Sequence, residues 1–322
     1  MMNVRMNLNR GRSVSPIAYP GPFHRRSLRV VAGVDWSGDS LAGVRASASL
    51  YVPDELVLVH AVPSSSMESR SRTDKARVRA CVSRESLQQH SIAAGKRSLT
   101  WVSALVHRAV PSTREVCHVG TPAGVLLDTA RAVGAELIVV GQRGARENLD
   151  GTIGSVSHEV CLNADCSTLV VRKGHGTPRR VVALIQHSED VVALRRWLRA
   201  VPFREPTDLT VLCLMTRPVR GEPIGPLSVQ FWNDAAMNNA RSLLNPLIRD
   251  LERPQLRITG RIVREDPATI VLREGVNFDL LMLHGSDRKG RDPRRSGMPW
   301  RALLRIAPCS TLIVRAMSAD TD

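Results

Sequence analysis

Glycines spaced around one short loop are the residues that most directly suggest chemistry in this sequence. Gly141 and Gly144 are separated by two residues, and Gly154 and Ser155 follow after a further nine. Glycine lets the backbone approach oxyanions closely, and the amides at a helix start attract negative charge. The spacing favours a phosphate-binding loop, although tight turns and helix starts also need glycine for structural reasons alone.

Polar side chains lie in and around this loop. Arg143 and Arg146 are inside it, where they either meet phosphate charge or remain solvated surface residues. Ser155 offers a hydroxyl that can donate to a ligand or cap the following helix. His60 and His158 have no partner pattern, and we interpret both as structural residues.

The loop can bind a ligand only if strands and helices bring it to the edge of a sheet. Apolar, β-branched runs predict strands, and apolar residues at intervals of three and four predict helices. The predicted strands are Leu28 to Val34, Leu56 to Val62, Glu115 to Val119, Leu137 to Val140 and Thr168 to Val171. The predicted helices are Asp39 to Leu50, about Thr73 to His107, Ala123 to Val133 and Ser155 to Asn163. This alternation predicts an α/β fold, in which a parallel sheet carries helices on both faces.

The pattern of elements begins again after a predicted linker, Lys173 to Arg180. Val181 to Ile185 repeats the first strand, and Leu209 to Leu214 repeats the second. The closing segments match best, since Cys166-Ser167-Thr168-Leu169-Val170-Val171 is answered by Cys309-Ser310-Thr311-Leu312-Ile313-Val314. Agreement along the chain indicates an internal duplication.

The glycine spacing and its surroundings resemble the ATP-binding signature of the universal stress protein family. The first strand ends in Gly33-Val34-Asp35, the second in His60-Ala61-Val62, and Gly154-Ser155-Val156-Ser157 follows the loop. The likeness covers Leu28 to Arg172 and, more weakly, Arg180 to Arg315. It implies two tandem doubly wound domains of the Rossmann-like, adenine nucleotide alpha hydrolase-like class. Each would hold a five-stranded parallel sheet with strand order 3-2-1-4-5.

The resemblance also implies an ATP site. The end of the first strand would line the adenosine, with the Asp35 carboxylate near the ribose or adenine, and the Ala61 backbone would hydrogen-bond adenine. The glycine loop would wrap the phosphates, and the following helix start would receive them. Taken alone, Asp35 is better explained as a turn-capping aspartate, and its place beside the glycine loop favours a ligand role. The implied cofactor-binding residues are Gly33, Val34, Asp35, Ala61, Gly141, Arg143, Gly144, Gly154, Ser155 and Val156.

The second copy departs from this signature. Gln186 stands in place of Asp35, and His284 in place of Gly141. Bulkier side chains where phosphate would meet bare amides weaken anion binding. We therefore expect the second copy to have lost ATP binding and to serve as a structural partner or a regulatory surface.

The family commonly pairs domains through their last strands. The resemblance therefore implies that Thr168 to Val171 lies against Thr311 to Val314 within the chain. A homodimer of whole chains is a further arrangement open to it. The expected organisation is a disordered basic leader at 1–27, a first domain at 28–174 with the intact motif, and a second at 179–317 with a degenerate one.

Composition bears on partners and location. A net charge of +15 would suit nucleic acid or an anionic membrane. Aromatic residues that could stack on bases make up only 3%, and no apolar run approaches the length of a membrane span. We expect no membrane partner and no specific nucleic acid. The six cysteines show no zinc-site spacing and are typical of a reducing cytosol, so a cytoplasmic location is expected.

Three functions stay open on the sequence. The leading one is an ATP-binding stress or regulatory protein in which ATP, with or without Mg²⁺, is a ligand with at most slow hydrolysis. No carboxylate pair or Walker lysine accompanies the loop. Trp36-Ser37-Gly38-Asp39-Ser40 resembles the pyrophosphate loop of adenylating ATP pyrophosphatases but lacks its second glycine. The third function is nucleic-acid binding through the basic surface, expected to be weak and non-specific.

Overall fold

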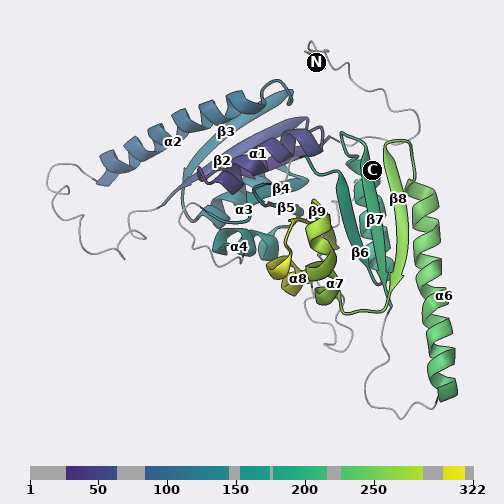
Figure 1. Cartoon of the computed structure of the whole chain (residues 1–322). Coiled ribbons are helices and arrows are strands. Elements are labelled where there is room, and N and C mark those ends of the chain that lie inside the picture. The colour runs from purple at the N-terminus through teal and green to yellow at the C-terminus, as the bar shows by residue number, and fades with distance from the viewer. Residues whose placement is uncertain are drawn as a thin grey trace, which may run out of the picture.

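The strands of the computed structural model form one ten-stranded sheet with the order β3-β2-β1-β4-β5-β10-β9-β6-β7-β8 (Figure 1). The structure describes residues 27–63, 84–144, 153–174, 177–215, 226–285 and 300–315. Several predictions lie outside these ranges: residues 1–26 of the leader, 73–83 of the long helix, Arg146 in the loop and 175–176 in the linker.

The first half of the sheet is parallel and has the predicted order 3-2-1-4-5. Its strands are β1 (Arg29–Gly33), β2 (Glu55–Val62), β3 (Ser112–Val119), β4 (Leu137–Gly141) and β5 (Ser167–Val171). Its helices are α1 (Gly38–Leu50), α2 (Arg84–Val106), α3 (Pro122–Val133) and α4 (Ser155–Asn163). Gly134 ends α3 in the left-handed conformation, with φ of 60°, which confirms its predicted role.

The second half repeats this arrangement. Its strands are β6 (Arg180–Ile185), β7 (Thr207–Leu214), β8 (Leu256–Val263), β9 (Leu280–His284) and β10 (Ser310–Val314). Its helices are α5 (Ser188–Ala200), α6 (Pro226–Leu251), α7 (Pro267–Glu274), the 3₁₀ turn η2 (Gly275–Asn277) and α8 (Trp300–Ile306). The order β8-β7-β6-β9-β10 mirrors that of the first half across the sheet, so the fold is duplicated. The domain bounds of 28–174 and 179–317 stay predictions.

The two halves join through β5 and β10, which pair antiparallel with Leu169 opposite Leu312. The Arg172 amide donates to Ser310 Oγ at 3.1 Å, and the Arg315 amide donates to Ser167 Oγ at 3.0 Å. These reciprocal bonds are what a two-fold relation between the halves requires. The predicted contact of the closing strands is confirmed, and the two predicted sheets are joined edge to edge into one.

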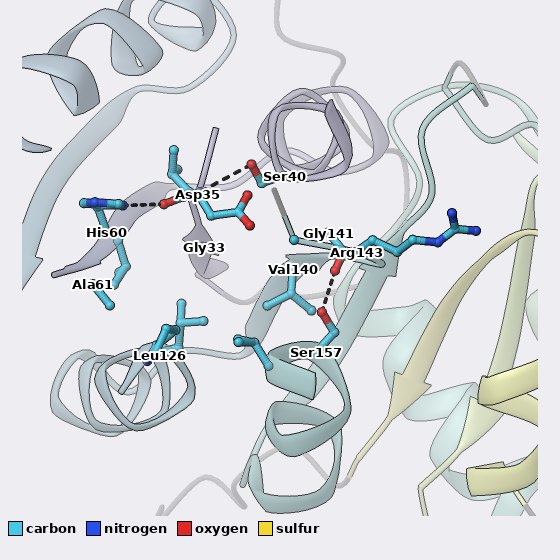
Figure 2. A pocket seen from close by; sticks show the side chains of 15 residues that line it. Gly33, Asp35, Ser40, His60, Ala61, Leu126, Val140, Gly141, Arg143 and Ser157 are labelled. Atoms are coloured by element: carbon cyan, nitrogen blue, oxygen red, sulfur yellow. Dashed lines mark hydrogen bonds between the residues drawn. The ribbon is translucent and has the colours of Figure 1, made fainter. Parts of the chain in front are cut away.

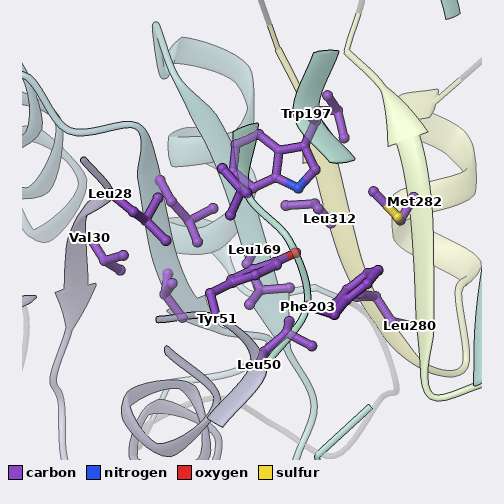
Figure 3. Close-up of a cluster of buried hydrophobic side chains, with 14 of the residues drawn as sticks. Leu28, Val30, Leu50, Tyr51, Leu169, Trp197, Phe203, Leu280, Met282 and Leu312 are labelled. Atoms are coloured by element: carbon purple, nitrogen blue, oxygen red, sulfur yellow. The ribbon is translucent and has the colours of Figure 1, made fainter. Parts of the chain in front are cut away.

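Each face of the sheet has its own core. Helices α1, α2, α5 and α6 cover one face, and α3, α4, α7 and α8 cover the other. On the first face the core runs across the junction, where Tyr51 stacks on Phe203 and meets Trp197 edge-on (Figure 3). Arg204 binds the end of α1 there, since its amide donates to the Leu50 carbonyl at 3.0 Å. Three of the eleven aromatic residues of the chain thus pack together where the halves meet.

Long helices flank both outer strands, with α2 against β3 and α6 against β8 (Figure 1). Among the described residues, no helix combines the length and the apolar character needed to cross a bilayer.

Candidate functional site

A cavity of about 120 Å³ lies at the carboxyl ends of β1 and β4, the neighbouring strands at the centre of the first half. The chain leaves β1 for α1 on one face and leaves β4 for α4 on the other. Such a divergence is where a doubly wound sheet leaves room for a ligand. The lining residues are Gly33, Val34, Asp35, Ser40, Val59, His60, Ala61, Pro122, Leu126, Val140, Gly141, Arg143, Gly144, Val156 and Ser157.

The cavity brings together most of the residues that the sequence predicted as a site. Gly33, Val34, Asp35 and Ala61 come from the β1 and β2 ends, and Gly141, Arg143, Gly144 and Val156 come from the β4 loop and α4. Figure 2 shows His60 and Ala61 at one end of the cavity and Gly141 with Arg143 at the other. Gly154 and Ser155 are not among the lining residues, since the lining of α4 begins at Val156.

Asp35 has two contacts that bear on its role. Its Oδ1 accepts the Ser37 amide at 3.0 Å, which is the turn-capping bond expected of an aspartate after a strand. Its Oδ2 lies 3.0 Å from where a Cβ on Gly144 would be, so the carboxylate also faces the glycine loop across the cavity. The two interpretations of Asp35 are therefore compatible.

Gly141 is required by packing. A Cβ at this position would lie 2.7 Å from the Ser40 nitrogen and 2.8 Å from the Asp39 carbonyl carbon. The start of α1 therefore rests directly on β4. Ser157 Oγ donates to the Gly141 carbonyl at 2.5 Å and ties α4 to the same point. Gly141 therefore has a structural role in packing α1 against β4, and it also lines the cavity.

Backbone amides near the loop already have partners within the protein. The Asp39 carboxylate accepts the Arg143 amide at 3.2 Å and the Lys173 amide at 2.9 Å. The Gly154 amide donates to the Gln142 carbonyl at 2.8 Å. No sequence pattern predicts that Asp39 holds these amides in place, because its partners are 104 and 134 positions away in the sequence.

His60 lines the cavity, although no sequence pattern predicts a ligand role for it. Its Nδ1 lies 2.7 Å from the Val34 carbonyl oxygen, so Nδ1 carries the proton in that bond. Ser40 and Ser157, at the first turns of α1 and α4, were missed as well. Both stand in segments that carry a resemblance, Trp36 to Ser40 and Gly154 to Ser157, and these segments were the available signal.

The rest of the wall is apolar, formed by Val59, Pro122, Leu126, Val140 and the Val156 side chain. Such a surface suits the flat, weakly polar face of a nucleobase. Within the described ranges, no cluster of three His, Cys, Asp or Glu residues could hold a metal ion.

Arg143 is the cationic side chain of the lining set. In Figure 2 its guanidinium extends away from the other labelled residues. Its Nε is buried and makes no hydrogen bond within the described part of the chain. This side chain must change rotamer to reach an anion in the cavity.

Cysteine chemistry is disfavoured at the described thiols. Burial raises the pKa of Cys161 and Cys166 to about 12, and that of Cys213 and Cys309 to about 11. These thiols stay protonated at neutral pH and are poor nucleophiles.

Larger side chains occupy the equivalent strand ends of the second half. Val30 pairs with Leu137 and Leu56, and Val181 pairs in the same way with Leu280 and Leu209. In this register Leu184 corresponds to Gly33, and Leu214 corresponds to Ala61. His284 corresponds to Gly141. Both leucines are buried.

An ionisable pair stands beside these leucines. His284 Nδ1 lies 2.9 Å from Oδ1 of Asp190, whose Oδ2 accepts the Gln186 and His187 amides at 2.8 and 2.9 Å. Burial by itself would raise the pKa of Asp190, but the bonds from His284 and from the two amides outweigh it and lower that pKa.

Comparison with known proteins agrees with this architecture. Residues 27–172 match the model of the universal stress protein family. No curated protein matches the sequence.

Solved structures match both halves. A universal stress protein from Archaeoglobus fulgidus is 12% identical, with a TM-score of 0.55, and the match covers 92% of this chain and 99% of that one. A functionally unknown protein from Pseudomonas aeruginosa PAO1 is 14% identical, with a TM-score of 0.53, and the match covers 90% of this chain and 93% of that one. At such identities the likeness shows the fold alone.

Proposed function

We propose that the first half binds an adenine nucleotide, specifically ATP, in the cavity between the carboxyl ends of β1 and β4. The observation that carries the proposal is that one cavity is lined both by the Gly33–Asp35 strand end and by Gly141 to Gly144. These segments lie far apart in the sequence. They offer an apolar wall for a base and, at the other end, a glycine loop beside the start of α4.

The two ends of the cavity suit the two ends of a nucleotide. Ala61, at the end of β2, lies beside the apolar wall, where a backbone group can meet the edge of adenine. Arg143, Gly144 and Val156 lie at the other end, where the first amides of α4 have no partner within the helix and its dipole favours negative charge. We place the base at the first end and the phosphates at the second.

ATP would act here as a regulatory ligand with at most slow hydrolysis. Asp35 is the carboxylate of the described lining, and one of its oxygens holds the Ser37 amide. Asp39, just outside, uses both oxygens on backbone amides. Neither of these two carboxylates is arranged to activate water. The Ser37 amide and the Asp39 carboxylate, which take part in these bonds, belong to the segment Trp36 to Ser40 that resembles a pyrophosphate loop.

The second half would then be a structural partner without ATP. Leu184, Leu214 and His284 fill the positions that stay open in the first half. We therefore expect one ATP per chain.

The proposal is tested by introducing into the first half a residue that the second half carries at the equivalent position. Gly33→Leu introduces the residue found at the equivalent Leu184, and its side chain would project toward Leu126 in the cavity wall. Gly144→Glu places a second carboxylate against Asp35, which phosphate would not tolerate. We expect the unaltered protein to bind ATP saturably at one site in isothermal titration calorimetry, and each variant to lose at least about tenfold in affinity.

Leu184→Ile is the matched control, because it conserves volume at the same position of the second half. It should bind ATP as the unaltered protein does. Folding of every variant is checked by circular dichroism, and mass spectrometry of nucleotide released from fresh protein identifies the natural ligand. Absence of saturable ATP binding by the unaltered protein, or equal binding by both folded variants, would overturn the proposal.

A further inference from the structure

A second cavity of the first half lies at the other end of β4 from the cavity proposed for the nucleotide. Its volume is about 190 Å³, and it lies where α3 and α4 end and where β4 and β5 begin. The two cavities share no lining residue. The proposed function makes no use of this second cavity, so its lining needs an explanation of its own.

Most of the buried lining of this cavity is apolar. Leu127 and Ala130 come from α3, and Ile138 comes from β4. All three side chains are almost fully buried. An apolar cavity of about 150 Å³ in another protein is large enough to bind benzene. The second cavity therefore has room for the body of a small organic molecule.

Bulkier side chains stand at the equivalent place in the second half. The strand registers put Phe278 in the place of Ala135, and Pro308 in the place of Asp165. Pro308 packs against the end of α7, since a Cβ on Gly275 would lie 2.8 Å from its Cγ and Cδ atoms. The cavity that Phe278 lines there has a volume of about 10 Å³. Among the described residues, the space is thus open in the first half and largely taken up in the second.

Carboxylates outnumber cations among the described residues around the cavity. Arg131, Glu136 and Asp165 line it. Arg131 pairs with Asp165 at 2.8 Å and with Asp128 at 3.2 Å, and Arg29 lies 3.6 Å from Glu136. Both α3 and α4 end here, and the C-terminal end of a helix carries partial negative charge. Although the whole chain has a net charge of +15, this cavity favours a cation.

Glu136 is the carboxylate best placed to hold that cation. Its side chain is 17% exposed, and its Oε2 accepts the Arg29 amide at 2.7 Å. Its Oε1 lies 3.6 Å from the Arg29 Nη2 atom, which is too long for a hydrogen bond. Asp165 differs, because it is 74% exposed and its Oδ2 already accepts the Arg131 Nε at 2.8 Å. A ligand that donates to Glu136 would therefore gain a bond in a partly buried place.

We propose that this cavity binds a small organic amine, with its apolar body over Leu127, Ala130 and Ile138 and its ammonium group at Glu136. The inference goes beyond the proposed nucleotide function and does not depend on it. Hydrogen bonds between an ammonium group and a carboxylate are stronger than those between neutral groups. Within the described ranges, no group of three metal-ligand side chains stands at the cavity, so its lining fits an organic cation better than a bare metal ion.

Phenethylamine is the probe, because it joins a benzene ring to a primary ammonium group. Its comparison compounds are 3-phenylpropionate, which carries a carboxylate on the same ring, and ethylamine, which lacks the ring. Calorimetry on the full chain should give a Kd on the order of 1 mM for phenethylamine, and at least about fivefold weaker binding for each of the others. In ¹⁵N-labelled protein, the amide signals of Gly134, Ala135 and Ser167 should shift as phenethylamine saturates the cavity that they line.

Two substitutions separate the space from the charge. Ala135→Phe introduces the residue found at the equivalent Phe278, and it should weaken phenethylamine binding by at least about tenfold. Ala132→Phe is the matched control, because Ala132 is exposed on α3 and lies outside the lining. Glu136→Gln keeps an acceptor for the Arg29 amide but removes the charge. It should weaken phenethylamine by about fivefold and remove the preference over 3-phenylpropionate.

Each outcome supports or overturns the inference once circular dichroism shows that the variants are folded. If the unaltered protein does not bind phenethylamine, or if Ala135→Phe binds it equally well, the cavity is not an amine site. If 3-phenylpropionate binds as tightly as phenethylamine, the proposed class of ligand is wrong. ATP affinity should be the same in Ala135→Phe as in the unaltered protein. A failure of the unaltered protein to bind ATP would overturn the nucleotide proposal and leave the amine site standing.

Discussion

Asp39 and Asp190 occupy matching positions in the first turns of α1 and α5, and both use their carboxylates to hold backbone amides. The neighbouring residue on the sheet differs. Gly141 leaves the place beside Asp39 empty of side chain, whereas His284 pairs with Asp190. The pair Gly141 and His284 is thus one of three positions, with Gly33 and Leu184 and with Ala61 and Leu214, at which the strand ends of the two halves differ.

The Asp190 carboxylate should make stability depend on pH. Because its pKa is lowered in the folded protein, the stabilisation is complete above its ordinary value of 3.8 and is lost as the pH falls through the lower folded-state pKa. Asp190→Asn should therefore flatten this acidic loss of unfolding free energy. At neutral pH it should cost about 1–3 kcal/mol, because His284 and two amides lose a charged partner. Urea unfolding across acidic and neutral pH measures both effects.

Asp208→Asn is the control for this experiment. Asp208 is exposed and forms only a surface ion pair with Arg257, which contributes little. A similar stability loss in both variants would show that the buried pair has no special role.

Among the elements, α1 connects the cavity, the sheet and the second half. It begins at the Ser37 cap beside the cavity, rests on β4 at Gly141 and ends against Arg204 of the second half. The close approach at Gly141 leaves no space for a side chain between helix and strand.

Gly141→Ala should therefore displace α1. The added Cβ would meet main-chain atoms of the helix at 2.7 and 2.8 Å, which cannot move independently of it. We expect a loss of about 1–3 kcal/mol in the free energy of unfolding. Gly33→Ala is the matched comparison, since its Cβ would meet the flexible Leu126 side chain at 3.2 Å and should cost less than about 1 kcal/mol. Equal costs in urea unfolding would contradict the packing argument.

Local signals in the sequence predicted the elements well. Apolar runs located the strands, Gly134 marked the end of α3, and α4 has the predicted bounds Ser155–Asn163. The repeated Cys-Ser-Thr segments indicated the duplication, and the resemblance to the universal stress protein family implied the β5–β10 contact.

The site was less predictable, because it depends on contacts between distant residues. The glycine motif located the β4 loop, but no local pattern shows that Gly141 lies against Asp39 or that His60 faces the cavity. The left-handed turn at Trp36 has no sequence signal, since glycine is the residue that such a turn normally predicts. The filling of the second cavity by Leu184 and Leu214 emerged only from the strand register.

At the scale of the molecule, the core over one face continues through the junction. Leu169 and Leu312 are buried opposite each other on β5 and β10, and both belong to that core. We expect the two halves to unfold in one transition. Leu312→Ala should shift the whole transition by about 2–5 kcal/mol, as seen by circular dichroism and tryptophan fluorescence together.

Leu272→Ala is the control, since Leu272 is 56% exposed and its removal should change stability little. Two separate transitions, with only the second half affected by Leu312→Ala, would show that the halves fold independently.

The antiparallel β5–β10 contact is formed within a single polypeptide. Dilution, which separates subunits held only by non-covalent contacts, leaves such a covalently tethered pair at constant local concentration. The tether therefore favours pairing of the two unlike halves of one chain over pairing of like halves from different chains. Every molecule inherits the same asymmetric combination, whatever its abundance in the cell.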